Sequence, residues 1–186
     1  MHPLMVVGGI VFVILLIFVI MYNKLVQAKN HCREAWSDVG TELKRRYDLI
    51  PNLVECVRGY AKYERELLEN VTRLRQECAA NHGSPENQAR SENLLVRALT
   101  TLYARVEAYP DLKASRNYLQ LQAELVNTED RIQAARRFYN GNVRENNNLT
   151  EMFPTNLVAG MFGFARREFF EVSDSRERAV PEVREK

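Results

Sequence analysis

Residues 4–50 read LMVVGGIVFVILLIFVIMYNKLVQAKNHCREAWSDVGTELKRRYDLI, and this stretch decides the fold. Its first part, Leu4–Tyr22, carries no charge. As a helix it would span roughly 28 Å, close to the ~30 Å hydrocarbon thickness of a bilayer. After Lys24 the apolar residues recur every three or four positions, at Leu25, Ala28, Cys32, Trp36, Val39, Leu43, Tyr47 and Ile50. This spacing predicts a membrane helix that continues without a linker into the first helix of a soluble domain.

A cleaved signal peptide is the alternative interpretation of the apolar segment. Such a peptide begins with basic residues, has a shorter apolar run and ends at a small-residue cleavage site. Here the chain begins Met1-His2-Pro3, and the apolar run ends in Met21-Tyr22-Asn23-Lys24. No cysteine follows that run until Cys32, so a lipoprotein site is not indicated either. The sequence therefore favours an uncleaved anchor over residues 1–23.

The distribution of charge divides the chain at the same point. None of the 26 Lys+Arg or 24 Asp+Glu residues lies in residues 1–23. Basic residues, beginning with Lys24, Lys29 and Arg33, follow the apolar segment and none precedes it. The positive-inside rule then predicts an outer N-terminus and a cytoplasmic C-terminal domain. The three cysteines, which cannot all pair within one chain, are compatible with a reducing compartment. The near-balanced charge argues against a nucleic-acid partner.

Two helices are predicted directly after the anchor. The first covers residues 24–49. Pro51 lacks an amide donor, so it predicts a kink or break before a second helix over residues 51–78. Residues 79–88 are then expected to form a loop. Within it, Ser84-Pro85 has the pattern of an N-cap followed by proline in the first turn.

Two further helices complete the predicted domain. The third is expected to end at Tyr109-Pro110, followed by a short connection over residues 111–115. The fourth has apolar residues at helical spacing from Tyr118 to Leu149. Its last third is rich in asparagine, a poor helix former, so this end is expected to fray. The asparagines are Asn140, Asn142, Asn146, Asn147 and Asn148.

These patterns predict an all-α fold. We expect an N-terminal transmembrane helix that is continuous with an antiparallel four-helix up-and-down bundle, followed by a short C-terminal apolar segment. The expected division is an anchor over residues 1–23, a helical domain over residues 24–172 and a charged, disordered tail over residues 173–186.

The apolar segment Met152–Phe164 is the main candidate for a functional surface. Alternating helix directions would return the fourth helix to the membrane, and the segment is too short to span a bilayer. It is expected either to cap the open end of the bundle or to contact lipid headgroups or a neighbouring subunit. The candidate interface residues are Leu157, Val158, Met161, Phe162, Phe164, Arg166 and Arg167.

No catalytic or metal-binding pattern is found in the sequence. His31, Cys32 and Glu34 could be part of a metal site, but no second cluster of metal ligands accompanies them. The chain also has no P-loop, G-x-G-x-x-G or nucleophile elbow. Cys56 and Cys78 would lie about 33 Å apart on one predicted helix, too far to share a zinc ion. We therefore expect no catalytic residues, no metal and no cofactor, and we expect the cysteines to be packing residues.

Several stretches in order are similar to the LemA family of bacterial membrane proteins. They are Glu34-Ala-Trp36-Ser-Asp38, Lys44-Arg-Arg-Tyr-Asp-Leu-Ile-Pro-Asn-Leu-Val-Glu55, Tyr109-Pro-Asp-Leu-Lys-Ala114, Arg136-Arg-Phe-Tyr-Asn140, Phe153-Pro-Thr-Asn-Leu157, Phe162-Gly-Phe164 and Arg167-Glu-Phe-Phe-Glu171. The resemblance implies a helical domain on an N-terminal anchor in the bacterial inner membrane, without known enzymatic activity. It also implies a link to the cell envelope, and one relative resembles a factor in magnetosome membrane formation. Some relatives carry a lipoprotein-type signal, which this chain lacks.

Three functional hypotheses follow. The first is a non-enzymatic, self-associating scaffold involved in membrane or envelope organisation or stress, with the lipid bilayer and further copies of the chain as partners. The alternative is an adaptor or regulator of another membrane protein, such as a protease or sensor, which would contact a patch near Arg45-Arg46-Tyr47-Asp48. A metal-dependent enzyme is the third hypothesis, and the sequence favours it least.

Overall fold

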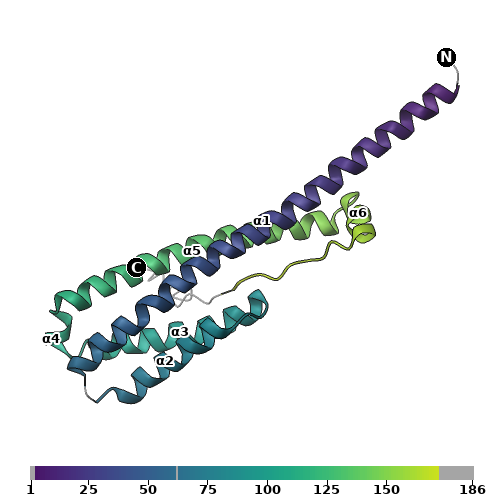
Figure 1. The fold of residues 1–186 in the computed structure, drawn as a ribbon. Coiled ribbons are helices and arrows are strands. Elements are labelled where there is room, and N and C mark those ends of the chain that lie inside the picture. Colours follow the sequence, from purple (N-terminus) through teal and green to yellow (C-terminus); the bar gives the residue numbers. More distant parts are fainter. Residues whose placement is uncertain (1–2, 62, 172–186) are drawn as a thin grey trace, which may run out of the picture. The chain divides into compact units, whose positions relative to one another are not determined.

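The computed structural model describes residues 3–61 and 63–171, and these residues are helical with no strand among them (Figure 1). The elements in order are α1 (Pro3–Tyr60), α2 (Arg65–Ala80), α3 (Pro85–Val106), α4 (Pro110–Lys113), α5 (Arg116–Glu151) and α6 (Thr155–Phe162). They belong to two compact units. Of the described residues, unit 1 comprises residues 3–41 and 134–169, and unit 2 comprises residues 42–61, 63–133 and 170–171. The tail predicted over residues 173–186 lies outside the described residues.

Helix α1 is one uninterrupted helix of 58 residues. Its first part is exposed and apolar, and among the described residues α1 is the one helix long and apolar enough to cross a membrane. The predicted continuity of the anchor with the following helix is therefore confirmed. Seven of the eight residues in the predicted apolar stripe are buried, and Trp36 is half-buried.

The break predicted at Pro51 was wrong, because α1 runs through this residue and ends at Tyr60. A proline inside a helix leaves the carbonyl four residues earlier without its usual donor. Here that carbonyl belongs to Tyr47, and it accepts a hydrogen bond of 2.9 Å from Nε of Arg75 on α2. The side chain of Arg75 thus takes the place of the missing amide. As a result α2 begins at Arg65 rather than at residue 51.

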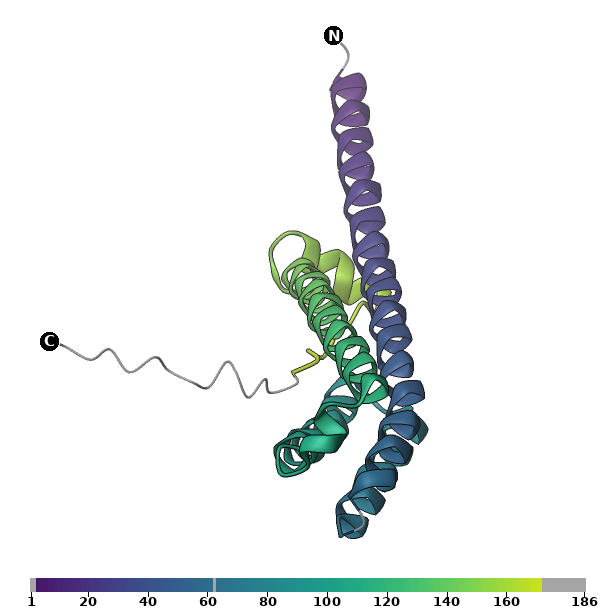
Figure 2. The ribbon, with the colours of Figure 1, turned by 90° about the vertical axis from the view of Figure 1, so that its left-hand side faces the viewer.

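Unit 1 is built from the first part of α1, the second part of α5, α6 and the segment that follows α6. Figure 2 shows α6 beside α1. The buried centre of this contact consists of Leu25 from α1 with Val158 and Ala159 from α6. Partly buried apolar residues surround it, namely Phe18, Met21, Leu149 and Phe164. Elsewhere in unit 1 the rings of Trp36 and Tyr139 pack with their centroids 5.1 Å apart.

The asparagine-rich end of α5 does not fray, so this prediction was also wrong. The helix continues to Glu151, with Asn146 and Asn147 buried. Asn147 Nδ2 donates to the Arg167 carbonyl at 3.0 Å, and Asn147 Oδ1 accepts from the Arg167 amide at 2.8 Å. Asn146 Nδ2 donates to the Ala165 carbonyl at 3.3 Å. These tertiary hydrogen bonds outweigh the low helix propensity of asparagine.

Unit 2 contains the last part of α1, helices α2, α3 and α4, and the first part of α5. Helices α2 and α3 pack against each other and are joined by a short turn. As predicted, Ser84 caps α3 by accepting a hydrogen bond from the Asn87 amide, and Pro85 occupies the first turn. The predicted connection over residues 111–115 contains the single turn of α4, which buries Leu112. Buried apolar residues come from all five of these segments.

Candidate functional site

The predicted interface segment of unit 1 forms a short helix and a reversal of the chain. Helix α6 ends at Gly163, whose φ of 68° lies in the left-handed region that glycine adopts without steric cost. The next residue, Phe164, donates its amide to the Ala159 carbonyl at 3.0 Å. This turn directs the chain back along α5, where the asparagines bind residues 165–167.

Aromatic side chains join α6 to the end of the apolar stretch of α1. The Phe162 ring lies 4.8 Å from the Tyr22 ring and 5.9 Å from the Phe18 ring, measured between centroids. The Phe164 ring lies 5.8 Å from that of Tyr22, and Nζ of Lys29 lies 5.9 Å from the Phe164 centroid. Tilted and edge-on ring contacts of this kind add to the stabilisation from area burial.

The same segment also presents large apolar side chains to the outside. We call this surface the α6 apolar face; it consists of Met152, Phe153, Leu157, Met161 and Phe162, and Phe162 lies at its border with α1. Phe153 is 79% exposed and Met161 is 71% exposed. Exposed apolar side chains that cluster in this way mark interaction sites more often than isolated ones do.

The seven predicted interface residues therefore divide into different roles. Leu157, Met161 and Phe162 belong to the α6 apolar face, whereas Val158 is buried against α1 and Phe164 is half-buried. The candidate set omitted Met152 and Phe153, which the structure exposes beside α6.

The two predicted arginines do not form one cationic pair. Arg166 is exposed, and its Nε lies 2.8 Å from Oε1 of Glu151. Arg167 is half-buried, and its backbone is held by Asn147. The charge of Arg166 is thus partly balanced by a neighbouring carboxylate, in a surface ion pair of small net energy.

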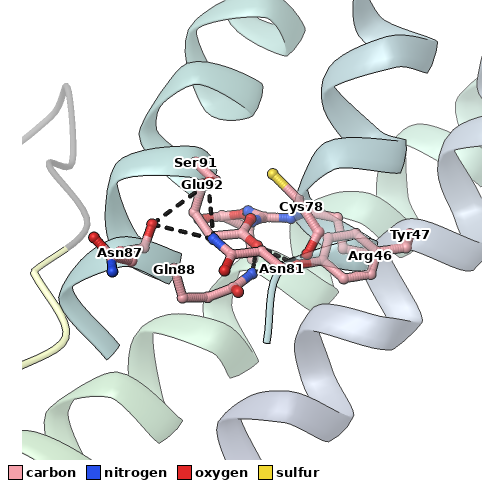
Figure 3. A network of polar contacts seen from close by, with 9 residues as sticks. Arg46, Tyr47, Cys78, Asn81, Asn87, Gln88, Ser91 and Glu92 are labelled. Atoms are coloured by element: carbon pink, nitrogen blue, oxygen red, sulfur yellow. Dashed lines mark hydrogen bonds and ion pairs between the residues drawn. The ribbon is translucent and has the colours of Figure 1, made fainter. Parts of the chain in front are cut away.

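A cluster of polar residues lies buried in unit 2 (Figure 3). Arg46 of α1 is 2% exposed and donates to Glu92 of α3, which is fully buried, and to Glu129 Oε2 of α5 at 2.8 Å. The Tyr47 hydroxyl donates to Glu92, and Gln88 Nε2 donates to Glu92 Oε1 at 2.7 Å. The same amide lies 3.0 Å from the Tyr47 hydroxyl oxygen. The buried Glu92 carboxylate links α1 to α3, and the Arg46 guanidinium links both helices to α5 through Glu129.

Burial and charge fix the protonation of this cluster. Burial, and next to it the Glu92 carboxylate, raises the pKa of the Tyr47 phenol well above its ordinary value. The same two causes raise the pKa of the neighbouring Cys78 thiol to about 12. Burial by itself lowers the pKa of Arg46, but Glu92 and Glu129 more than offset this, so the pKa of Arg46 is raised. At neutral pH Arg46 is therefore charged, and Cys78 is a thiol with little nucleophilic character.

The sequence did not predict that Arg46 binds Glu92 and Glu129 in a buried cluster, although Arg46 was part of the predicted partner patch. Of the arginine pair at residues 45–46, only Arg45 is exposed. A signal was present, because Arg46 lies three residues after Leu43 and four before Ile50, on the buried face of α1. With Arg46 and Tyr47 buried, the proposed patch at residues 45–48 is not a continuous exposed surface.

The cysteines and histidines form no metal site among the described residues. Cys32 and Cys78 are buried, Cys56 is half-buried, and all three are free thiols. Cys56 lies on α1 and Cys78 on α2, because α1 extends past Pro51. The prediction that these two cysteines share one helix was wrong.

Unit 2 also has an open groove of about 640 Å³ between the last turns of α1 and the start of α5. Its apolar lining residues are Leu49, Cys56 and Leu121. Polar lining residues surround them, namely Asn52, Glu55, Ser115, Asn117, Gln120 and Glu124. Gly59 also lines the groove, and a Cβ atom at this position would meet no other atom within 4 Å. The groove was not predicted from the sequence.

Comparison with known proteins gives a family and several relatives. The LemA family model matches residues 35–184. Protein LemA of Metamycoplasma hominis is 29% identical over 152 residues, covering 82% of this chain and 69% of that protein. Magnetosome protein MamQ 2 of Paramagnetospirillum magneticum is 27% identical over 197 residues, covering 91% and 72%. Magnetosome protein MamQ of Magnetospirillum gryphiswaldense is 26% identical over 175 residues, covering 80% and 64%. The family match begins beyond the apolar stretch of α1.

Proposed function

The chain belongs to the LemA family, and from this premise we propose that it is a non-enzymatic single-pass membrane protein that acts as a self-associating scaffold in membrane or envelope organisation. The observation that carries the proposal is the exposed apolar part of α1, which adjoins the α6 apolar face. Together they form a surface suited to lipid or to other apolar helices rather than to water.

The membrane part of the proposal rests on α1. Its apolar stretch is long enough to cross a bilayer, and most of its side chains are exposed rather than packed within the chain. An apolar helix of this kind needs a lipid environment to cover it. We place it in the bacterial inner membrane with the N-terminus outside and the C-terminal domain in the cytoplasm, as the flanking charges predict.

The non-enzymatic part rests on the chemistry of the buried cluster and on the relatives. Arg46 and Tyr47 both donate hydrogen bonds to Glu92, and Cys78 beside them stays protonated, which suits a structural role. The relatives are named as protein LemA and as magnetosome proteins, and these names denote no enzyme. We also propose that the helices past the anchor form an antiparallel four-helix bundle.

Self-association is tested by counting copies of the full chain in lipid nanodiscs. The chain is labelled with a fluorophore and reconstituted at several protein-to-disc ratios, and bleaching steps are counted in each disc. We expect discs with several copies even when discs are in excess. A single-span protein of unrelated sequence serves as the control. One copy per disc at every ratio and lipid composition would contradict the scaffold.

A second candidate function, an adaptor for another membrane protein, is favoured by the groove in unit 2. Its rim carries Glu55 and Glu124 together with several amides, and no basic residue lines it. A segment bearing Lys or Arg complements such a rim, and loops of this charge are common on the cytoplasmic side of membrane proteins. Gly59 leaves room for the backbone of a partner to approach closely.

The adaptor function is tested with peptides and matched variants of the full chain in detergent. Binding of a labelled Lys/Arg-rich peptide is measured by anisotropy and should be weakened by Glu55→Gln with Glu124→Gln. Gly59→Leu should also weaken it by filling the groove. Glu66→Gln with Glu69→Gln, on the exposed surface of α2, removes the same two charges elsewhere and serves as the control. Equal binding by all variants would contradict this function.

A further inference from the structure

We infer that the α6 apolar face inserts into the interfacial region of the same bilayer that α1 spans, so that the chain holds the membrane at two points. The face consists of Met152, Phe153, Leu157, Met161 and Phe162. This inference rests on the proposed function, because it requires α1 to lie in a bilayer. It adds a second, non-spanning contact with lipid and names the side chains that make it.

The depth of α6 follows from its contacts with α1. Phe162 packs on Phe18 and Tyr22, which lie at the end of the uncharged stretch. Phe18 precedes Tyr22 by one helical turn, or about 6 Å along the helix axis. If the uncharged stretch fills the hydrocarbon region, α6 lies at its boundary with the headgroups. The contacting residues of α1 and of α6 both belong to unit 1, so their relative positions are defined.

The composition of α6 suits a boundary position. Eight residues give a helix of about 12 Å, too short to span a bilayer. Val158 and Ala159 are covered by α1, whereas Leu157 and Met161 project away from it. A helix with one side held by protein and the other apolar side open can lie in the plane of the interface. Aromatic rings beside it, such as Tyr22, are typical of that depth.

The charges nearby favour lipid over a second copy of the chain as the occupant. Lys24 follows directly after the apolar stretch, and Lys29 lies over the Phe164 ring one to two turns further along α1. Arg166, which is exposed close to the end of α6, pairs with Glu151 and adds less to this positive charge than the two lysines do. Cationic side chains next to an apolar surface suit the headgroup layer, where their charges stay hydrated while their stems contact lipid. The α6 face is also continuous with the part of α1 that lipid already covers.

Tryptophan fluorescence in vesicles containing brominated phosphatidylcholine tests the inference. The native tryptophan is first removed by Trp36→Phe, which keeps a ring against Tyr139. Single tryptophans are then introduced in the full chain by Met161→Trp, by Phe12→Trp in the anchor, and by Leu119→Trp on the exposed surface of unit 2. Leu157→Trp provides a second probe of α6, and circular dichroism checks the helix content of every variant.

The expected pattern separates the inference from the proposed function. Met161→Trp and Leu157→Trp should be quenched most by lipids brominated near the glycerol backbone, and Phe12→Trp by lipids brominated deeper in the chains. Quenching of Leu119→Trp should be several-fold weaker. If both α6 probes behave like Leu119→Trp while Phe12→Trp is quenched, α6 does not touch lipid and the inference fails alone. If Phe12→Trp is not quenched, the anchor itself is wrong, and both fail.

Discussion

At the scale of single residues, Glu92 determines how the helices of unit 2 pair. A buried carboxylate is costly unless it is paired and hydrogen-bonded, and Glu92 accepts from Arg46, Tyr47 and Gln88. Any shift of α1 along α3 would separate these partners. We therefore predict that the cluster disfavours other helix registers more than it increases the stability of the observed one.

Replacing Arg46 by methionine should destabilise unit 2 strongly. The substitution leaves Glu92 buried without its cation, and we expect a loss of about 3 to 5 kcal/mol in the free energy of unfolding. The measurement is urea unfolding of the full chain in detergent, followed by circular dichroism. Arg73→Met serves as the control, because Arg73 pairs with Glu77 on the exposed surface and should cost less than about 1 kcal/mol. Equal losses for the two variants would show that the buried Arg46–Glu92 pair contributes no more to the free energy of unfolding than the exposed pair does.

Cys78 should make stability decrease in alkaline solution. Its pKa is about 12 in the folded chain, above the ordinary value of 9.0. Below pH 9 the thiol is protonated in both states and has no effect on the pH dependence. Between pH 9 and 12 the unfolded thiol loses its proton and the folded one does not, so the stability falls as the pH rises.

The size of this effect can be measured with a matched pair of variants. At pH 11 the loss is at most about 2 to 3 kcal/mol relative to pH 8, at about 1.36 kcal/mol per pH unit. Cys78→Ala should remove this part of the slope, whereas Cys56→Ala, at a half-buried thiol, should leave most of it. Urea midpoints at both pH values provide the test, and an unchanged slope in Cys78→Ala would contradict the assignment.

At the scale of elements, α1 shows how a distant side chain extends a helix. The sequence predicted the stripe of buried residues correctly because periodicity reports on burial. It could not predict that Pro51 is tolerated, since the compensating donor, Arg75, lies on another helix. The asparagines of α5 led to the wrong prediction that its end frays, and the reason is the same. Their helix propensity is a property of the residue, but their hydrogen bonds to residues 165–167 depend on the tertiary fold.

The Arg75–Tyr47 hydrogen bond should couple energetically to Pro51. Arg75→Met should cost about 1 to 2 kcal/mol, because it leaves the Tyr47 carbonyl without a donor. In a Pro51→Ala background the alanine amide supplies that donor, so the same substitution should cost less. A double-mutant cycle on unfolding free energies measures the difference. Strictly additive effects would mean that Arg75 does not compensate for the proline.

Asn147 should protect the segment after α6 from proteolysis. It makes two hydrogen bonds to the backbone of Arg167, and trypsin cleaves after Arg166 and Arg167. Asn147→Ala should raise the rate of cleavage there about ten-fold, the equivalent of about 1.4 kcal/mol in local opening. Asn148→Ala, at an exposed position, is the control. Products are identified by mass spectrometry, and equal rates in the two variants would exclude this role.

At the scale of the whole molecule, the sequence predicted the long apolar N-terminal helix and the helical class but not the arrangement of polar residues. The burial of apolar residues can be predicted from their periodic spacing in one helix. The partners of Arg46 cannot be predicted in this way, because they come from α3 and α5, far along the chain. The groove in unit 2 could not be predicted either, because it depends on the separation of α1 from α5. The α6 segment was predicted as apolar, and the structure distinguishes its covered side from its exposed one.

The proposed orientation can be tested by labelling cysteines in a bacterial host. His2→Cys places a thiol before the anchor, and native Cys56 is a half-buried thiol in unit 2; Cys32 and Cys78 are buried. A membrane-impermeant maleimide should label His2→Cys in intact cells. It should label Cys56 only after the cells are permeabilised. The reverse pattern would place the C-terminal domain outside the cytoplasm.

The construction of unit 1 from residues 3–41 and 134–169 also affects biosynthesis. Leu25 is covered by Val158 and Ala159, which are translated more than a hundred residues later. At ~5–20 residues per second this interval is roughly 5 to 30 s. During that time the anchor can already be inserted while its neighbouring apolar stripe has no partner. We therefore expect the nascent chain to be most prone to aggregation before the ribosome reaches α6, because the stripe around Leu25 is uncovered until then.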